Sequence, residues 1–300
     1  MFLLNTTEKI LVLVFLVTSM LSIGMQTRVS DLRSLVASRG FLVRTLLANF
    51  LVVPIAGVVV VLLLPLRPYV AGALVLLACT PGGLSAVQFT SQLKGSAPLA
   101  GAILCLLSFL ALFISPLILQ LVLPENVQMV IPYGRALLFF LVYMLVPLLV
   151  GMLLLGKVPG AATRLSKPVA LAGVVAFIVF MVVTGSARRA AAGEIGMAAV
   201  GAMLLFILVS IAVGWFMGGP TRDSRQILAT STSMRNAVLC LAIVESSSPG
   251  HAVLVPLIAF SLLMVPPNML FTVYHTIREK RKAKKASLAR ESGSPGGREI

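Results

Sequence analysis

Long runs of hydrophobic residues, separated by short polar segments, follow one another along almost the whole chain. A helix that crosses the hydrocarbon core of a bilayer needs about 20 consecutive apolar residues, and most of these runs approach or exceed that length. The pattern predicts an all-α polytopic membrane protein with about nine transmembrane helices. We place these helices near residues 10–26, 41–64, 70–93, 98–123, 132–156, 166–185, 195–218, 224–246 and 252–277.

The spans form a single predicted transmembrane domain over residues 1–277, with a first half at about 10–123 and a second half at about 132–277. The first run could instead be a signal peptide, but no small-residue cleavage site follows it, so we favour a retained span. Residues 278–300 begin with a basic cluster and continue rich in Ser, Gly, Pro and charge. This composition predicts a disordered cytoplasmic tail.

Composition and charge narrow the class of protein further. Of the 300 residues, 59% are hydrophobic and only 11% are charged, which excludes a soluble globular domain. The net charge of +15 comes from basic residues at the ends of apolar runs, not interleaved with aromatics, so we expect no nucleic acid as a partner. Their distribution predicts a cell (inner) membrane protein with the N-terminus outside and the C-terminus cytoplasmic. The lipid bilayer is then a partner, and the oligomeric state stays open, a monomer included.

Three cysteines, Cys79, Cys105 and Cys240, lie inside predicted spans without a Cys-x-x-Cys spacing. Neither a disulfide framework nor a zinc site is indicated, and we expect no cofactor.

Arg235 is the ionisable residue that stands in the middle of a predicted span. A central arginine costs about 2.5–3.5 kcal/mol on membrane-insertion scales, and the acidic residues fall in loops or at span ends. A cation at the midplane without an acidic partner suggests that an anion from outside the chain neutralises it. A contact with the carbonyls of unwound backbone is the alternative.

Two segments correspond at an offset of 151 residues: Ser85 to Pro98, and Asn236 to Pro249. Each follows a helix-breaking sequence, Pro81-Gly82-Gly83 in one span and the polar run Thr230 to Asn236 in the other. The spans are five apart, so they cross the bilayer in opposite directions. Corresponding broken helices in inverted halves indicate the central site of a transporter. The alternative is a packing kink in one span and helix–helix hydrogen bonds in the other.

Motifs at the two breaks and at two other places resemble those of the bile acid:sodium symporter (BASS) family. The chain resembles a divergent bacterial-type member of that family. The four motifs are Ala48-Asn49-Phe50 with Pro54 after it; Cys79 to Gly83; Met234-Arg235-Asn236; and Pro267 to His275. The resemblance implies an inverted repeat of ten helices, or nine without the first. It also implies core and panel domains, two crossed unwound helices, and organic anions carried by alternating access.

The chain departs from the family at the sodium sites. The resemblance places sodium-ligand positions on Ala86, Val87, Ser231, Arg235 and Asn49, where the ligand set looks degraded. A guanidinium about 4 Å away would oppose sodium by about 4 kcal/mol at an effective dielectric near 20. We therefore expect no metal site and disfavour sodium coupling. Our hypothesis is that Arg235 supplies, as a tethered charge, the positive field that sodium supplies in relatives.

The sequence thus predicts a secondary transporter of small organic anions, with Arg235 as the counter-charge of the substrate. One alternative is a sodium-coupled symporter with non-standard ion ligands, and another is a receptor or sensor on the same fold. An enzyme is excluded because the motifs of intramembrane proteases are absent. The predicted substrate-binding residues are Arg235, Asn236, Thr80, Pro81, Gly82, Ser85, Ser231, Ser233, Asn49, Gln88 and His275.

Overall fold

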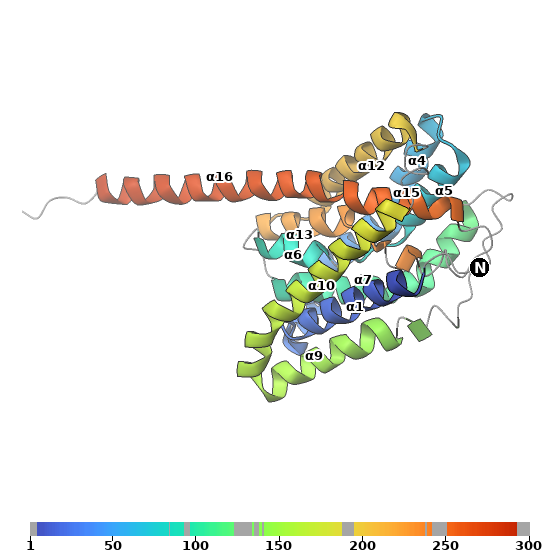
Figure 1. Cartoon of the computed structure of the whole chain (residues 1–300). Coiled ribbons are helices and arrows are strands. Elements are labelled where there is room, and N and C mark those ends of the chain that lie inside the picture. Colours follow the sequence, from blue (N-terminus) through green and yellow to red (C-terminus); the bar gives the residue numbers. More distant parts are fainter. Residues whose placement is uncertain are drawn as a thin grey trace, which may run out of the picture.

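The computed structural model describes residues 5–83, 85–92, 97–122, 134, 138–139, 141–187, 195–237, 239–241 and 251–292. Within these residues the secondary structure is helical throughout, and Figure 1 shows the helices gathered in one bundle. Five helices are long and apolar enough to cross a membrane, and a bent pair makes a sixth. The prediction of an all-helical polytopic membrane protein is confirmed.

Five predicted spans appear as continuous helices. The spans are α1 (Thr6–Gly24), the joined helices α3 (Arg39–Leu47), η1 (Ala48–Val52) and α4 (Val53–Leu63), α10 (Pro159–Ala187), α12 (Gly196–Met217), and α15 (His251–Leu263) with α16 (Val265–Ser292). The span predicted at 98–123 is α7 (Ala97–Val122), in which Leu99–Ala111 and Phe113–Leu119 meet at 43°. The remaining helices outside the breaks are α2 (Val29–Ala37), η2 (Leu141–Leu145) and α9 (Val146–Lys157).

Two predicted spans are each broken near the middle. The first comprises α5 (Pro68–Cys79) and α6 (Ser85–Gln92), and the second begins with α13 (Arg222–Ser233) and resumes helical structure at Ala237. At 1.5 Å per residue, a 12-residue helix such as α5 or α13 reaches only about 18 Å, so none of these half-helices crosses the bilayer alone. Both breaks lie where the proline, glycine and polar residues predicted them.

The helices α1, α9 and α10 pack against one another and are called the α1–α9–α10 group below. In Figure 1, α9 lies along the lower side and α10 runs diagonally from the lower left to the upper right. Glycines bring α1 and α9 together: a Cβ on Gly24 would overlap the carbonyl oxygen of Leu148, and one on Gly151 would overlap that of Leu21. Small residues of this kind allow close packing of helices in a membrane.

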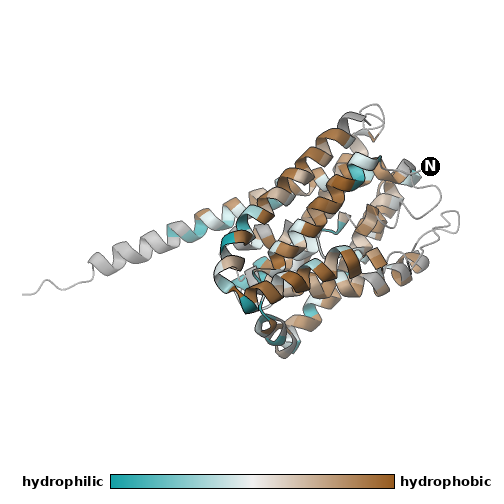
Figure 2. Cartoon of the chain, turned by 60° about the horizontal axis from the view of Figure 1, so that its bottom comes forward, coloured by the Kyte–Doolittle hydropathy of each residue, from teal (hydrophilic) through white to brown (hydrophobic). Residues whose placement is uncertain are grey.

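The outer surface of the bundle is apolar. Large side chains such as Leu62, Leu121 and Phe216 are exposed, and Figure 2 shows the helices mostly in brown. A soluble protein avoids such a surface, whereas a lipid-facing protein requires it.

The disorder that we predicted from residue 278 onwards is wrong as far as Ser292, because α16 continues to that residue. Figure 1 shows α16 projecting from the bundle. Lysine, arginine and alanine dominate this stretch and all have high helix propensity, and a helix that is already formed propagates at little cost. Residues 293–300 of the predicted tail lie outside the described residues.

Candidate functional site

The first break has a local cause in the sequence. Pro81 disfavours helical backbone at Thr80, and Thr80 accordingly leaves the helix with φ −113° and ψ 79°. Gly82 has a φ of +92°, which glycine adopts without strain. A Cβ on Gly83 would lie 2.5 Å from the carbonyl oxygen of Met234, so the close approach of the second break requires glycine here.

Two backbone hydrogen bonds join the breaks. The amide of Gly83 donates to the carbonyl of Met234 at 3.1 Å, and the amide of Asn236 donates to the carbonyl of Thr80 at 2.9 Å. Groups released from the helices therefore satisfy one another, as buried backbone must in a membrane. We call residues 80–83 and 234–236 the crossing.

The side chain of Arg235 is buried at the crossing with 1% of its surface exposed. Its guanidinium carries five N–H donors, and five hydrogen bonds use them. Nε donates to the carbonyl of Leu77 at 2.9 Å. Nη1 donates to Asn49 Oδ1 at 3.0 Å and to the carbonyl of Thr232 at 3.4 Å, and Nη2 donates to the carbonyls of Asn49 at 3.4 Å and of Ala78. All five acceptors are neutral oxygens.

Helix ends supply three of these oxygens. Leu77 and Ala78 lie in the last turn of α5, and Thr232 lies in the last turn of α13. Carbonyls in a last turn lack the full set of i+4 partners of a helix interior, although that of Leu77 also accepts from the amide of Thr80 at 3.1 Å. The aligned dipoles give such an end about half a negative charge. Two half-helices therefore present their negative ends to Arg235.

The fourth carbonyl is that of Asn49, and a proline leaves it without a partner in its own helix. In η1 the amide of Val53 bonds five residues back to Ala48, so the carbonyl of Asn49 would pair next with the amide of residue 54. That residue is Pro54, which has no N–H. The Asn49 carbonyl is thus left to Arg235.

Asn49 lies on this turn with its side chain fully buried. Its Oδ1 accepts from Arg235, and its Nδ2 donates to the carbonyl of Thr45 at 3.0 Å. The structure therefore brings Asn49, Thr80, Arg235 and Asn236 together at the crossing. Contact of Arg235 with carbonyls of the unwound backbone was the alternative left open by the sequence, and this conformation shows such contacts. The sequence did not show that they would be those of Leu77, Ala78 and Thr232, although the nearby helix ends were a signal.

Asn236 holds one unused donor. Its Oδ1 accepts from the amide of Leu239 at 3.0 Å and so caps the helix that resumes there. Its Nδ2 is buried and has no hydrogen-bond partner among the described residues, with 1% of the residue exposed. A buried amide without an acceptor costs about 1–3 kcal/mol, so this donor is a candidate for bonding a ligand.

The hydroxyl groups predicted for the site bond within the protein in this conformation. Thr80 Oγ1 donates to the carbonyl of Leu76 at 3.0 Å, and Ser231 Oγ donates to that of Leu228 at 3.1 Å. Ser233 Oγ bonds Asn268 Oδ1 at 2.7 Å and so ties α13 to α16. Pro81 and Gly82 form the break itself. Ser85 and Gln88 lie on α6, but their side chains are outside the described residues.

Of the positions that the resemblance gave to sodium, two border a small cavity and one is Arg235 itself. Ala86 and Ser231 border a cavity of about 10 Å³, which is about the space of one water molecule. Thr90 lines it too, but its hydroxyl bonds Thr230 at 2.8 Å, and the lining holds no carboxylate. Arg235 occupies another of these positions with a positive charge. Within the described residues, no three His, Cys, Asp or Glu side chains are grouped to hold a metal ion.

His275 lies away from the crossing. Its Nδ1 is 2.9 Å from Arg222 Nη2, its ring stacks on Trp215, and Arg222 forms an ion pair with Glu279. Arg222 begins α13, so this cluster is about 16 Å along the helix from Ser233.

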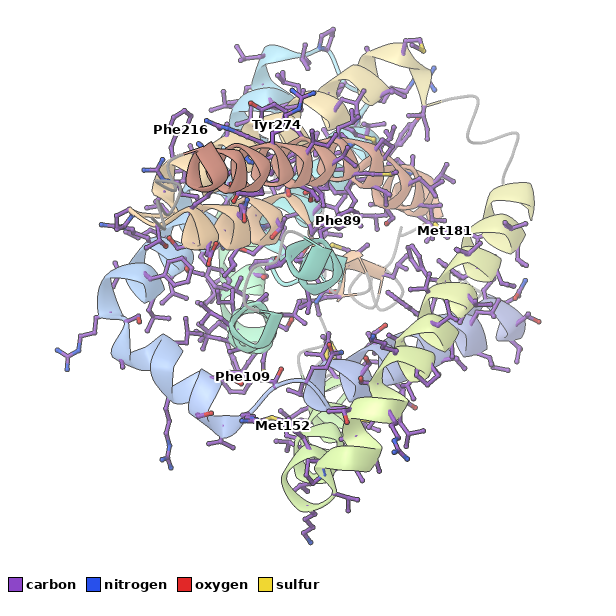
Figure 3. The ribbon with its side chains drawn as sticks, turned by 90° about the vertical axis from the view of Figure 1, so that its left-hand side faces the viewer. Phe89, Phe109, Met152, Met181, Phe216 and Tyr274 are labelled. Carbon is purple, nitrogen blue, oxygen red and sulfur yellow. The ribbon has the colours of Figure 1, made fainter. Side chains whose placement is uncertain are left out.

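A larger apolar cavity of about 560 Å³ is lined by α1 and α10 on one side and by α6, α15 and α16 on the other. Figure 3 labels Phe89 on α6 and Met181 on α10, which lie on its two sides. The sequence did not reveal this cavity, because its walls come from helices far apart in the chain. Its lining residues are Phe15, Phe89, Val174, Phe177, Ile178, Met181, Val182, Leu262, Val265 and Pro266.

The chain is similar in sequence to two known transporters. The chain is 23% identical over 276 residues to the uncharacterized sodium-dependent transporter YocS of Bacillus subtilis (strain 168), which covers 88% of this chain and 79% of that protein. It is 27% identical over 212 residues to the ileal sodium/bile acid cotransporter of Oryctolagus cuniculus, covering 67% of this chain and 59% of the rabbit protein.

A family profile matches more than half of the chain. It is described as the sodium bile acid symporter family, and it matches residues 13–192, which include both α5 and α6. Its members are membrane transporters and not enzymes. The chain therefore belongs to the sodium bile acid symporter family.

Proposed function

We propose that the protein is a secondary transporter of small organic anions, which binds its substrate at the crossing and works by alternating access. The observation that carries this proposal is the buried Nδ2 of Asn236, for which the described part of the chain offers no hydrogen-bond partner. An anionic oxygen would accept its N–H and remove the cost of leaving it unpaired. The helical turns that begin at Ala237 and at Ser85 would add the positive ends of their dipoles.

Arg235 would act on the substrate through its charge. All five of its N–H donors are already used, so a bidentate bond to a carboxylate or sulfonate would require breaking hydrogen bonds to the crossing. Its charge still acts at a distance: about 6 Å away, at an effective dielectric near 20, it attracts an anion by about 3 kcal/mol. A substrate bonded to the neighbouring Asn236 would lie within that range.

The apolar cavity would hold the hydrocarbon part of the substrate. A volume of about 560 Å³ lies within the usual range of small-molecule sites, and the walls are almost wholly hydrophobic. The cavity borders α6, which begins directly after the first break. An anionic group at the crossing and a carbon skeleton against Phe89 and Met181 would together account for both features.

The rest of the predicted plan belongs to the same proposal. Residues 1–277 would form one transporter domain with nine crossings, if each broken pair counts as one span. The α1–α9–α10 group would move against the other helices and open the crossing to each side in turn. Thr80, Pro81, Gly82, Ser85, Ser231, Ser233, Asn49, Gln88 and His275 stay predicted contacts, of which His275 has no support from its position.

Sodium-coupled symport is the second candidate, because the names of the relatives describe a sodium-dependent transporter and a sodium/bile acid cotransporter. Uptake by the purified protein in liposomes, with sodium replaced by choline, separates the two. An unchanged rate supports a carrier without sodium coupling, and a loss of uptake supports sodium symport.

Asn236→Ser tests the binding role directly. Serine keeps an oxygen that can cap the helix at Leu239, but it removes the amide donor. A hydrogen bond to a charged group contributes about 1.5–3 kcal/mol, so KM for the transported anion should rise roughly ten- to hundredfold. Without substrate, the melting temperature should not fall below that of the wild type, because the cap is kept and the unpaired donor is removed. An unchanged KM, measured by uptake of labelled organic anions, would refute the role of Asn236.

A further inference from the structure

We propose that the guanidinium of Arg235 is the resident cation of an oxygen cage at the crossing, so that the carrier needs no external cation there. The role of this cage in transport rests on the proposed function, whereas the cage itself is defined by the geometry of the described residues.

The cage consists of five oxygens from three separate parts of the chain. The end of α5 contributes two carbonyls, the end of α13 contributes one, and Asn49 in η1 contributes its carbonyl and its Oδ1. They converge on one planar group that is almost completely buried. Three elements are therefore held together through a single positive charge.

The five oxygens suit a monovalent cation. They are neutral, and three of them lie at the negative ends of half-helices, the arrangement that transporters use to bind sodium or protons at broken helices. A cage without a carboxylate leaves a net charge of about +1 once it is filled. Without a cation, these oxygens would lose the donors that Arg235 provides, and among the described residues Leu77 would still accept from Thr80. Buried oxygens without a donor are avoided in proteins.

A tethered cation differs from a free one in what it can do. A free ion that completes the crossing can leave on the other side of the membrane, and its gradient can then drive the substrate. The guanidinium of Arg235 is covalently attached and stays in the protein through each cycle. It can therefore hold the crossing together and attract an anion, but it cannot transfer energy from an ion gradient.

Chemical rescue of Arg235→Ala tests the cage without any substrate. The variant loses the cation, and its melting temperature should fall by several degrees. Guanidinium chloride, at concentrations far below those that denature proteins, should raise it by about 2–4 °C or more, because binding to the folded state stabilises it. Choline chloride at the same concentration has no N–H donor and should produce no rise.

Arg225→Ala is the matched control. Arg225 lies on α13, the half-helix that precedes Arg235. Its Nε donates to the carbonyl of Gly219 at 2.7 Å, but the side chain is partly exposed and outside the cage. Guanidinium should not stabilise this variant or the wild type. Equal shifts in all three proteins, or no shift in Arg235→Ala, would overturn the cage.

Arg235→Lys keeps the test decisive if the alanine variant fails to fold. An ammonium group retains the charge and offers three donors, so this variant should fold with a melting temperature below that of the wild type. Its own charge occupies the cage, and guanidinium should leave it unchanged. A rise in its melting temperature with guanidinium would show that the cage does not hold the charge of residue 235.

Uptake into liposomes tests the consequence for transport. Wild-type uptake of an organic anion should stay within about twofold when choline replaces sodium. Arg235→Ala should lose at least about tenfold, and guanidinium on both sides of the membrane should restore part of the rate. Wild-type uptake that requires sodium would overturn the tethered-cation role. Failure of the wild type to transport any anion would instead contradict the proposed function, while the thermal rescue would still decide the cage.

Discussion

Arg235 is a charge that the protein keeps buried by surrounding it with main-chain oxygens rather than with an acidic partner. Desolvation of a charged side chain is costly in a membrane, but each hydrogen bond to a charged donor recovers about 1.5–3 kcal/mol. Five such bonds explain how the residue is tolerated at the centre of the bundle. The same bonds explain why the guanidinium has no donor free for a bidentate bond to a substrate in this conformation.

Gly83→Ala should disrupt the crossing at the single-residue scale. The added Cβ would lie 2.5 Å from the carbonyl oxygen of Met234 and 2.7 Å from that of Arg235, so the two breaks would have to separate. We expect a loss of several degrees in melting temperature and at least tenfold slower uptake. Gly72→Ala on α5 is the control, because a Cβ there meets nothing within 4 Å and should stabilise the helix by up to about 1 kcal/mol. Equal melting temperatures for both variants would contradict this account.

Residue-level features were predictable only in part from the sequence. The position of Arg235 in the middle of a span followed from hydropathy, and its adjacency to a broken helix followed from Pro81, Gly82 and Gly83. Its partners did not follow, because every residue carries a carbonyl and only the folded backbone decides which ones converge. The unpaired amide of Asn236 is likewise visible only once the partners of its Oδ1 are known.

At the scale of elements, local chemistry decides where each helix stops. Proline and glycine end α5, and proline at position 54 opens the turn of η1, so these features can be recognised in a sequence. The continuation of α16 to Ser292 was missed, because composition alone does not show that a finished span can extend its helix into a charged segment. The apolar cavity was missed because it belongs to no single element.

Pro54→Ala tests whether the turn of η1 serves the site. An alanine at this position restores an N–H that can bond the carbonyl of Asn49, and Arg235 then loses one acceptor. The helix gains a backbone hydrogen bond, so the melting temperature should hardly change. Uptake should fall by about fivefold or more if the bond to Arg235 contributes about 1 kcal/mol or more to the active arrangement.

Pro147→Ala provides a matched control on α9. Pro147 follows η2 at the same spacing as Pro54 follows η1, but it lies in the α1–α9–α10 group, and no described carbonyl of η2 bonds Arg235. Its uptake should remain close to that of the wild type. A similar loss in both variants would show that the prolines act on helix shape in general.

At the scale of the whole molecule, basic side chains from several helices gather near the start of α13. Arg222 pairs with Glu279 near the end of the last span, and Arg225 bonds the carbonyl of Gly219. A Cβ on Gly219 would lie 2.5 Å from Nη1 of Arg44, which brings α3 to the same place. Figure 2 shows hydrophilic residues in teal where α16 leaves the bundle. The positive-inside rule assigns such an end to the cytoplasm.

Reporter fusions at the two termini test this orientation together with the number of crossings. A fluorescent protein that folds only in the cytoplasm should be bright when it follows Ile300, and a phosphatase that is active only outside should be silent there. At the N-terminus the pattern should be reversed, because nine crossings place the two ends on opposite sides of the membrane. Both ends on the same side would mean an even number of crossings, so that one broken pair enters and leaves by the same face. In that case the two halves would not be inverted copies of each other. Movement of the α1–α9–α10 group against the other helices would then not explain how the crossing opens to both sides of the membrane.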